Sequence, residues 1–220
     1  MKNIIIVGAS GHSRVVVDII EKQSKYRISG FVDSGRTVGE CISGYNVLGA
    51  ETEIPELVET HKIAGFIIAI GDNSVRSIVA DKIKRIFPQA EFVSAIHPQA
   101  VIGKDVCIGT GTVVMAGAII NPCSTVGNFC IINTKASLDH DSLMGDFSSL
   151  APGVTTGGNC NIGNFSAIGI GASIKHGVTI GAHSVVGGAA MVMQDIEAFT
   201  VNYGIPSKKI RNRTQGEKYL

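Results

Sequence analysis

The 220-residue sequence predicts a small parallel α/β domain followed by a prism-shaped stack of short β-strands. Strand-like and helix-like segments alternate over the first hundred residues, which is typical of a parallel sheet covered by helices. From about residue 100 onward, large aliphatic residues recur at every sixth position without an insertion. The composition agrees, because 27 Gly and only 5% aromatic residues in a chain that is 45% hydrophobic favour a turn-rich β-structure over disorder.

The N-terminal part alternates three predicted strands, at 3–7, 28–32 and 64–70, with two predicted helices. Each helix carries an apolar stripe that we expect to face the sheet. The stripes are Val15, Val16, Ile19 and Ile20 in the first helix and Val75, Ile78, Val79, Ile83 and Ile86 in the second. Pro98 favours an extended path into the repeat region. We therefore expect an α/β domain at 1–96, a repeat domain at 97–198 and a tail at 199–220.

Sixteen consecutive hexads make up the repeat region, and each has one large and one small position that we expect to point inward. The large positions are Ile102, Ile108, Val114, Ile120, Val126, Ile132, Leu138, Met144, Leu150, Thr156, Ile162, Ile168, Ile174, Ile180, Val186 and Val192. Large aliphatics would fill the axis of a triangular prism, and small residues would let neighbouring coils stack. Three hexads make one coil, so the region predicts about five coils at the ~4.8 Å spacing of stacked strands.

Thr156 is the single exception among these large positions, since the other fifteen are apolar. The small position lies two residues earlier in each hexad and never holds a residue larger than Val. Cys130 and Cys160 occupy small positions. We therefore expect both cysteines to be packing residues rather than nucleophiles.

Charge and cysteine usage exclude several classes of protein. A net charge of +1 argues against nucleic acid or an acidic membrane surface as the main partner. No apolar run approaches the ~20 residues that a spanning helix needs, so we expect no membrane insertion. Met1 leads almost directly into the first strand, which predicts no signal peptide. Five cysteines without C-x-x-C spacing favour reduced thiols in a cytoplasmic protein.

His140 is the main candidate for chemistry, because it stands between Asp139 and Asp141 in a turn that follows an inward leucine. A carboxylate beside an imidazole fixes its tautomer and raises its basicity. Acyl transfer to an amine or hydroxyl needs a base of pKa near 7, which a histidine with a carboxylate partner supplies. The alternative is that this outward histidine is only solvated, and the local sequence leaves both interpretations open.

Polar and glycine-rich turns follow the predicted strands of the α/β domain, at 8–13, at Asp33 and at 71–73. Ligands bind at the carboxyl ends of such strands, and a glycine loop before a helix can hold a phosphate. Ser10 and Ser13 stand where the dinucleotide fingerprint requires glycine, so we do not expect NAD. The alternative is a tight strand-to-helix turn without a ligand.

The motif GASGH at 8–12, the motif GDNSVR at 71–76 and the uninterrupted hexads together resemble the hexapeptide-repeat sugar acyltransferases. The resemblance covers nearly the whole chain. It includes the sialic acid O-acyltransferases and the bacillosamine-type N-acetyltransferases of UDP-linked 4-amino-sugars. It implies a Rossmann-like α/β domain that holds a nucleotide-sugar and a left-handed parallel β-helix that holds acetyl-CoA. It also implies a homotrimer with active sites between protomers.

The same resemblance implies catalytic roles, because residues 132–141 match the catalytic stretch of the family. By this match His140 is the general base and Asp141 is the carboxylate that raises its basicity. Asn133 is expected near the thioester. Gly158 falls where the family supplies a backbone N–H to the developing oxyanion, a donor worth about 3 kcal/mol.

Ligand contacts are implied in the same way. Ile170 and Gly188 fall where the family packs the pantetheine arm of acetyl-CoA. Ser149 stands where the bacillosamine-type enzyme has a second histidine that contacts acetyl-CoA, so the role of Ser149 is open. The sugar-nucleotide contacts are expected at Gly11, His12, Ser13, Asp33, Ser34 and Gly71.

Three further expectations concern assembly, metal and tail. Four outward apolar residues should be covered in the trimer: Val113, Ile119, Ile131 and Leu143. His140 and His176 stand two coils apart, roughly 10 Å, which is too far for one zinc ion, so we expect no metal. The basic tail either meets the phosphates of coenzyme A or, beyond Arg211, is a solvated and frayed end.

We therefore expect an acetyl-CoA-dependent acetyltransferase that acts on the amino group of a nucleotide-linked, UDP-type 4-amino-sugar in bacterial surface-glycan biosynthesis. One alternative is O-acetylation of sialic acid or another polysaccharide sugar, since amine and hydroxyl acceptors use the same base. A further alternative is a non-catalytic scaffold that binds a sugar nucleotide.

Overall fold

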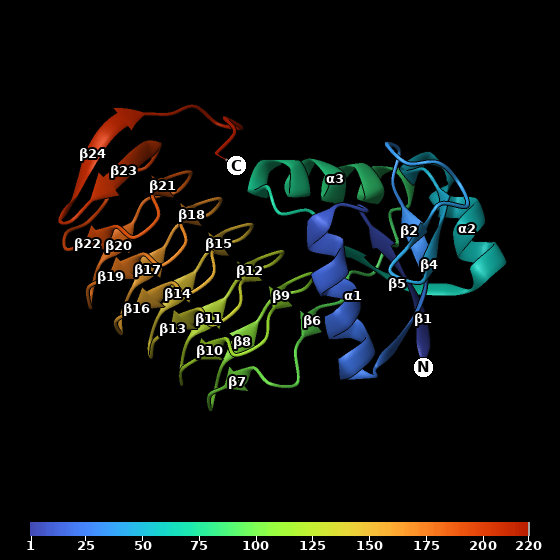
Figure 1. Ribbon diagram of the computed structural model, residues 1–220, viewed down its shortest axis with the longest axis horizontal. Coiled ribbons are helices and arrows are strands. Elements are labelled where there is room, and N and C mark those ends of the chain that lie inside the picture. The colour runs from blue at the N-terminus through green and yellow to red at the C-terminus, as the bar shows by residue number, and fades with distance from the viewer. Residues whose placement is uncertain (220) are drawn as a thin grey trace.

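The computed structural model describes residues 1–219, in which an α/β domain leans against one flank of a parallel β-helix (Figure 1). The five-stranded sheet of the α/β domain has the order β3-β4-β2-β1-β5, with β1, β2 and β5 parallel. The predicted elements are present as β1 (Lys2–Val7), α1 (Gly11–Gln23), β2 (Tyr26–Val32), β5 (Ile63–Ile68) and α3 (Asn73–Ile86). Among residues 1–219, no helix combines the length and hydrophobicity needed to cross a membrane.

Sequence reasoning missed the segment between β2 and β5. It contains β3 (Cys41–Ile42), β4 (Tyr45–Gly49), the 3-10 turn η1 (Glu51–Glu53) and α2 (Ile54–His61). β3 and β4 form a short antiparallel hairpin at the sheet edge, and β4 also pairs in parallel with β2. β3 has no buried residue and β4 buries only Val47 and Gly49, so the hairpin lacks the buried apolar run that reveals a central strand.

The predicted apolar stripe of α3 is wrong at two positions. Val75 is 40% exposed and Ile78 is 65% exposed, whereas Asn73 and Arg76 are buried with Ile83. The helix has turned a polar asparagine and arginine inward because both side chains donate hydrogen bonds to the β-helix. In α1 the predicted stripe is buried except at Val15, which is 38% exposed.

The β-helix contains all sixteen predicted repeats as two-residue strands, and each strand ends at the predicted large residue. They are β7 (Val101–Ile102), β8 (Cys107–Ile108), β9 (Val113–Val114), β10 (Ile119–Ile120), β11 (Thr125–Val126), β12 (Ile131–Ile132), β13 (Ser137–Leu138), β14 (Leu143–Met144), β15 (Ser149–Leu150), β16 (Thr155–Thr156), β17 (Asn161–Ile162), β18 (Ala167–Ile168), β19 (Ser173–Ile174), β20 (Thr179–Ile180), β21 (Val185–Val186) and β22 (Met191–Val192). From β7 to β19 each strand pairs in parallel with the strand 18 residues later, which confirms three hexads per coil.

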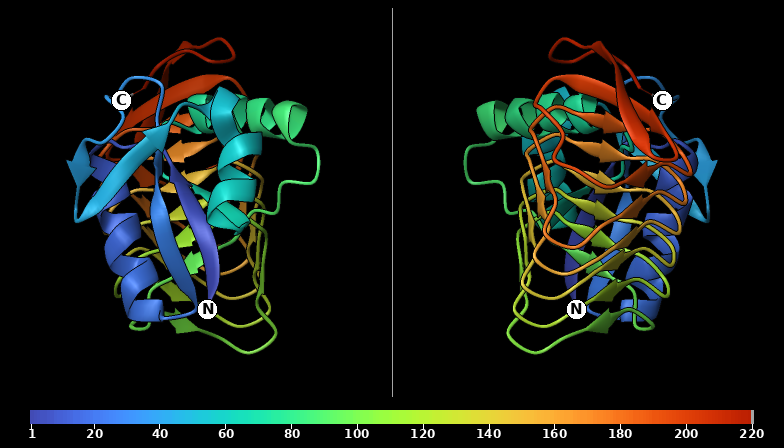
Figure 2. Two further views of the ribbon diagram at one scale, coloured as in Figure 1. Left: turned by 90° about the vertical axis from the view of Figure 1, so that its right-hand side faces the viewer. Right: turned by 90° about the vertical axis from the view of Figure 1, so that its left-hand side faces the viewer.

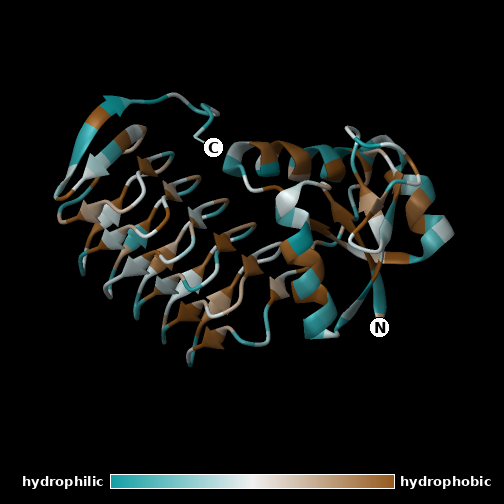
Figure 3. Ribbon diagram, in the orientation of Figure 1, coloured by the Kyte–Doolittle hydropathy of each residue, from teal (hydrophilic) through white to brown (hydrophobic). Residues whose placement is uncertain are grey.

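Three flat sheets form the sides of the prism (Figure 2), and hydrophobic residues recur along its strands (Figure 3). From Val114 to Val192 every large inward residue is buried, and Ile102 in the first coil is 38% exposed at the open end. Cys130 and Cys160 are buried in the small column, and burial raises the pKa of both thiols, that of Cys130 to about 11. The sheet nearest the α/β domain begins two residues before the predicted boundary, at β6 (Ala95–Ile96), and the predicted division at 96/97 stays a prediction.

A ladder of rings runs along one edge of the prism. Phe129 stacks on Phe147 with ring centroids 4.9 Å apart, and Phe147 stacks on Phe165 at 5.2 Å. His183 continues the stack at 4.7 Å from both Phe165 and Phe199. Stacked pairs at this spacing add roughly 0.5–1.5 kcal/mol each beyond burial of their area. The ladder therefore tightens the edge that meets α3.

Two of the four outward apolar residues are covered by the chain itself. Val113 is 1% exposed and Ile131 is 4% exposed, because both pack in the core beneath the α/β domain. The expectation that a trimer partner covers them is therefore wrong. Ile119 and Leu143 remain open, at 37% and 51% exposed.

The C-terminal segment folds back over the last coils toward α3 (Figure 1). β23 (Thr200–Gly204) extends the sheet of β21, and β24 (Ser207–Asn212) pairs with it in antiparallel. Arg213 is buried and donates to the carbonyl of His183, and its guanidinium lies 5.7 Å from the Tyr219 ring. The expectation of a frayed end beyond Arg211 is therefore wrong for residues 212–219.

Arg76 is the largest fully buried side chain, and it fastens the α/β domain to the β-helix. Its Nε donates to the carbonyl of Phe129 at 2.7 Å, and Nη2 donates to that of Phe147 at 3.1 Å. Nη1 donates to the carbonyls of Ile70 and Gly71, both at 2.9 Å. Burial lowers the Arg76 pKa to about 10, so the guanidinium stays charged at neutral pH. One cation thus satisfies carbonyls from both parts of the chain.

Replacing Arg76 with methionine should cost about 3–5 kcal/mol of unfolding free energy, because several buried carbonyls lose their donor at once. Urea denaturation followed by circular dichroism measures the loss. Arg85→Met is the matched control, since Arg85 lies on the exposed side of the same helix. A loss below about 1 kcal/mol for Arg76→Met would show that solvent replaces the clasp.

Candidate active site

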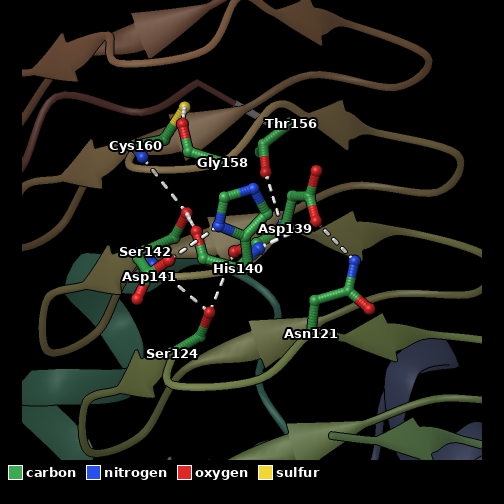
Figure 4. A network of polar contacts seen from close by, with 9 residues as sticks. All are labelled: Asn121, Ser124, Asp139, His140, Asp141, Ser142, Thr156, Gly158 and Cys160. Carbon is green, nitrogen blue, oxygen red and sulfur yellow. Dashed lines mark hydrogen bonds and ion pairs between the residues drawn. The ribbon is translucent and has the colours of Figure 1, made fainter.

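His140 stands on the turn between β13 and β14, with its side chain 49% exposed (Figure 4). Its Nδ1 lies 2.7 Å from Oδ2 of Asp141. This hydrogen bond raises the pKa of His140 above its ordinary value, and the negative charge of Asp139 adds to the rise. A carboxylate that accepts from Nδ1 leaves Nε2 as the basic nitrogen of the neutral ring. The arrangement can therefore accept a proton at Nε2.

The turn that carries His140 is held by its own polar groups. Oδ1 of Asp139 accepts the backbone N–H of His140 at 2.8 Å and Nδ2 of Asn121 at 2.5 Å. These two hydrogen bonds, the backbone one first, lower the pKa of Asp139 and keep it ionised. Asp141 has a left-handed backbone, with φ of 56°. The imidazole is thus mounted on a turn whose backbone is fixed from both sides.

Gly158 lies one coil above His140 in the same column of turns. A Cβ at position 158 would fall 2.5 Å from His140 Nε2, so only glycine leaves room for this imidazole. Among residues 1–219, no group accepts a hydrogen bond from the Gly158 N–H. A free N–H beside a basic nitrogen is the pair that acyl transfer requires: a proton acceptor and a donor for an oxyanion.

His176 completes this column one coil further along. Its ring centroid lies 6.2 Å from that of His140, and the predicted separation of roughly 10 Å is therefore wrong. The two rings approach because the glycine between them has no side chain to keep them apart. Within residues 1–219, no group of three or more His, Cys, Asp or Glu side chains is arranged to hold a metal ion.

A groove of about 560 Å³ lies between the α/β domain and the β-helix. Asn133, Ile170 and Gly188 line it together, as expected of one binding surface. A Cβ at Gly188 would meet Ile170 Cγ2 at 3.2 Å, so a side chain at position 188 would crowd Ile170 and narrow the groove. Ser149 also lines the groove.

The C-terminal residues add a wall that sequence reasoning missed. Tyr203 and Tyr219 both line the groove, and the Tyr219 hydroxyl accepts the N–H of Asn73 at 3.1 Å. The phenol also hydrogen-bonds with Ser149, and burial raises its pKa above the ordinary value. Only the three-dimensional return of the tail reveals this contact, because 146 residues separate Asn73 from Tyr219.

Within one chain, the groove and the His140 turn lie on different edges of the prism. Asn133, Ile170 and Gly188 follow β12, β18 and β21, which belong to one sheet. His140 and Gly158 follow β13 and β16, which belong to the next sheet. The structure therefore brings Gly158 to His140 and separates it from the other three predicted cofactor contacts.

His12 and Gly71 face the groove from the α/β domain. Burial, followed by the positive charge of Arg76, lowers the pKa of His12 to about 4. Its imidazole is therefore neutral at pH 7. Nε2 of His12 is buried and has no hydrogen-bond partner within residues 1–219. This atom is available to a ligand in the groove.

A second cavity, of about 350 Å³, opens at the first turn of α1. Gly11 lines it with Arg14, Arg36 and Glu40. Two guanidinium groups and the amino end of a helix favour an anionic ligand. Sequence reasoning identified the glycine and missed both arginines. Arg36 comes from a different loop, whereas Arg14 lies in the same helix as Gly11.

The remaining predicted sugar-nucleotide contacts, Asp33, Ser34 and Ser13, lie at or next to the loop that precedes α1. Asp33 accepts the N–H of Ala9 at 2.7 Å and the N–H of Gly35 at 2.8 Å. Ser34 is exposed beside it. Ser13 is fully buried, and its hydroxyl donates to the carbonyl of Ser10 at 2.6 Å. Both Asp33 oxygens and the Ser13 hydroxyl thus close the loop, and their direct contact with a ligand stays a prediction.

Comparison with known proteins agrees with this geometry. Residues 3–83 match the family described as the PglD N-terminal domain. A variant of GDP-perosamine N-acetyltransferase from Caulobacter crescentus, in complex with CoA and GDP-perosamine, is 32% identical with a TM-score of 0.90, covering 96% of this chain and 98% of that chain. The acetyltransferase domain of PglB from Neisseria gonorrhoeae, in complex with acetyl coenzyme A, is 30% identical with a TM-score of 0.87, covering 95% and 99%.

A curated relative is UDP-N-acetylbacillosamine N-acetyltransferase from Bacillus subtilis, 34% identical over 116 residues. The match spans 53% of this chain and about half, 52%, of that relative. The structural agreement over 96% of the chain confirms the expected α/β domain and left-handed β-helix. The protein therefore belongs to the left-handed β-helix sugar N-acetyltransferases, a family of CoA-dependent acetyltransferases.

Proposed function

We propose that the protein transfers the acetyl group of acetyl-CoA to the amino group of a nucleotide-linked 4-amino-sugar. The observation that carries the proposal is the His140–Asp141 pair set against the free N–H of Gly158. The named substrates of the relatives, GDP-perosamine and UDP-N-acetylbacillosamine, supply the class of acceptor. The nucleotide itself is open between UDP, GDP and dTDP.

In the proposed reaction the amine of the sugar attacks the thioester carbonyl directly. His140 Nε2 accepts the proton that the amine loses, while Asp141 stabilises the imidazolium that forms. The Gly158 N–H donates to the oxyanion of the tetrahedral intermediate. When the C–S bond breaks, the imidazolium returns the proton to the departing CoA sulfur. Cys130 and Cys160 are buried with raised pKa values, which favours this route over an acyl-enzyme.

The two cavities suit the two ends of the sugar nucleotide. The Gly11 cavity offers Arg14 and Arg36 to a diphosphate. From there the sugar would reach the groove at His12 and Gly71, which the pantetheine arm enters along Ile170 and Gly188. A neutral His12 has an Nε2 that accepts hydrogen bonds from a sugar hydroxyl or amine.

A complete site would need two copies of the chain, because one copy holds the groove and the base on different edges. We propose a closed homotrimer in which the His140 edge of one protomer faces the groove of the next. The exposed side chains of Ile119 and Leu143 lie on sheets that flank the His140 edge. All five cysteines are free, which suits the proposed cytoplasmic location.

Release of free CoA thiol tests the proposed activity. The assay uses a panel of acceptors that contains UDP-, GDP- and dTDP-linked 4-amino-sugars, with free sialic acid as the hydroxyl acceptor. Turnover on an amino-sugar nucleotide supports the proposal. Turnover on sialic acid alone would move the assignment to O-acetylation, and acetyl-CoA binding without turnover on any member would favour a scaffold.

His140→Ala should lower kcat by about 10²- to 10⁴-fold with little change in the KM of either substrate, because a general base acts on the transition state. Steady-state thiol release on the active acceptor measures this split. His61→Ala is the control, since within residues 1–219 the His61 side chain takes part in no described hydrogen bond. A normal kcat in His140→Ala would remove His140 from the mechanism.

Asp141→Asn should move the acidic limb of the pH profile of kcat/KM to lower pH. Asp141 raises the pKa of His140, so the base is protonated, and inactive, up to a higher pH when the carboxylate is present. Removing the charge lowers that pKa and also weakens the base, so the plateau should fall. Asp105→Asn is matched to it, because Asp105 is an exposed left-handed residue in the same column of turns. An unshifted limb would contradict the pairing.

Mixed oligomers should reveal a site shared between chains. His140→Ala lacks the base, and Gly188→Trp fills the groove of an otherwise normal chain. Each variant alone should be inactive, whereas trimers co-assembled from equal amounts should regain about a quarter of the wild-type rate, the fraction of interfaces with both halves intact. Size-exclusion chromatography with light scattering confirms the assembly. Absence of recovered activity in verified mixed trimers would place the whole site in one chain.

A further inference from the structure

Thr156 is the one polar residue among the sixteen large inward positions of the β-helix. It is 4% exposed and ends β16, with apolar neighbours above and below it on the prism axis. A hydroxyl buried among aliphatic side chains is unfavourable unless it is hydrogen-bonded. The partner of this hydroxyl therefore indicates why the repeat is broken at this position.

The Thr156 hydroxyl accepts the backbone N–H of Asp139 at 2.9 Å (Figure 4). In the other coils of this sheet the equivalent N–H donates to a main-chain carbonyl instead. These bonds run from Gly103 to Ile120, Asn121 to Leu138, Gly157 to Ile174 and Lys175 to Val192, at 2.7, 2.9, 2.8 and 2.9 Å. A side chain has thus replaced a backbone acceptor in one coil of the ladder.

The strand register changes at the same point. β13 pairs with β16 through Ser137 and Thr155, and the pairing does not continue to Leu138 and Thr156. The pairs before and after it, β10 with β13 and β16 with β19, extend over both residues. The irregularity coincides with the turn that carries His140.

The substituted hydrogen bond joins two turns that the proposed mechanism uses. The backbone N–H of Asp139 donates to the Thr156 hydroxyl, and the Asp139 carboxylate accepts the backbone N–H of His140. Thr156 stands two residues before Gly158. The hydroxyl therefore lies between the backbone that carries the base and the backbone that carries the oxyanion donor.

We infer that Thr156 is a positioning residue that sets the distance and angle between the His140 imidazole and the Gly158 N–H. The inference rests on the proposed function of these two groups. A valine at 156 has nearly the same shape and would fill the axis like its neighbours, but it cannot accept the Asp139 N–H. That N–H would then turn to the carbonyl of residue 156, as in the other coils, and carry the His140 turn with it.

The test compares Thr156→Val, Thr156→Ala and Thr156→Ser on the acceptor that supports turnover. Thr156→Val should lower kcat roughly 10- to 100-fold, because a displacement of a catalytic group by about 1 Å or less costs a rate loss of this order. The KM of acetyl-CoA and of the sugar nucleotide should stay within about two-fold, because the groove is on another edge. Thr156→Ser should recover most of the rate. Thr156→Ala also removes the hydroxyl, and its result does not depend on how a valine packs on the prism axis.

Thr155→Val is the matched control, since its side chain lies on the same strand and faces outward. Thermal unfolding of each variant separates a lost fold from a displaced turn. A parental kcat in folded Thr156→Val, or equal losses in the serine and valine variants, would overturn the inference. His140→Ala decides the proposed function separately: if that variant keeps its rate, the base assignment fails whatever Thr156 does.

Discussion

The 18-residue period of the β-helix is the constraint on which the rest of the site depends. Each turn residue lies directly over the residue 18 positions earlier, so 140, 158 and 176 form one column. Successive coils are only ~4.8 Å apart, which is less than the reach of a histidine side chain. Two imidazoles fit in this column because Gly158 separates them without a side chain of its own. The same spacing brings a backbone N–H beside a basic nitrogen without any flexible loop.

A regular prism also limits what one chain can build. Its three edges are spread around the axis, so residues of the groove and residues of the His140 turn cannot approach each other inside one protomer. The α/β domain takes up part of the outer surface by covering Val113 and Ile131. Arg76 holds the domain in that place through carbonyls of Phe129 and Phe147. An internal clasp thus fixes one half of a site whose other half is proposed to come from a neighbour.

The sequence predicted the repeat better than the parts that interrupt it. Sixteen strands were placed correctly because one inward position in six is large and, except at Thr156, apolar. The stripe of α3 was misplaced, since a helix that buries Arg76 against carbonyls does not follow hydropathy. Tyr219 and Arg36 were missed because both reach their cavities from distant segments. Spacing between coils overestimated the distance from His140 to His176, because backbone separation does not describe two long side chains that lean together.

In a repetitive fold, each position inherits an expectation from the coils above and below it, so a departure requires a local cause. Thr156 departs from an aliphatic column, and the hydrogen bond that it offers replaces a ladder bond at one turn. Gly158 stands between two histidines in a column of turns, and the missing side chain is the space that His140 occupies. Both departures lie two residues apart on the coil that follows that of His140, and both act on the same imidazole. Packing of the coils alone requires neither residue, because an aliphatic residue would fill the axis at 156 and the atoms that a side chain at 158 would meet belong to the His140 imidazole. A demand for one fixed geometry between a base and a backbone donor explains both.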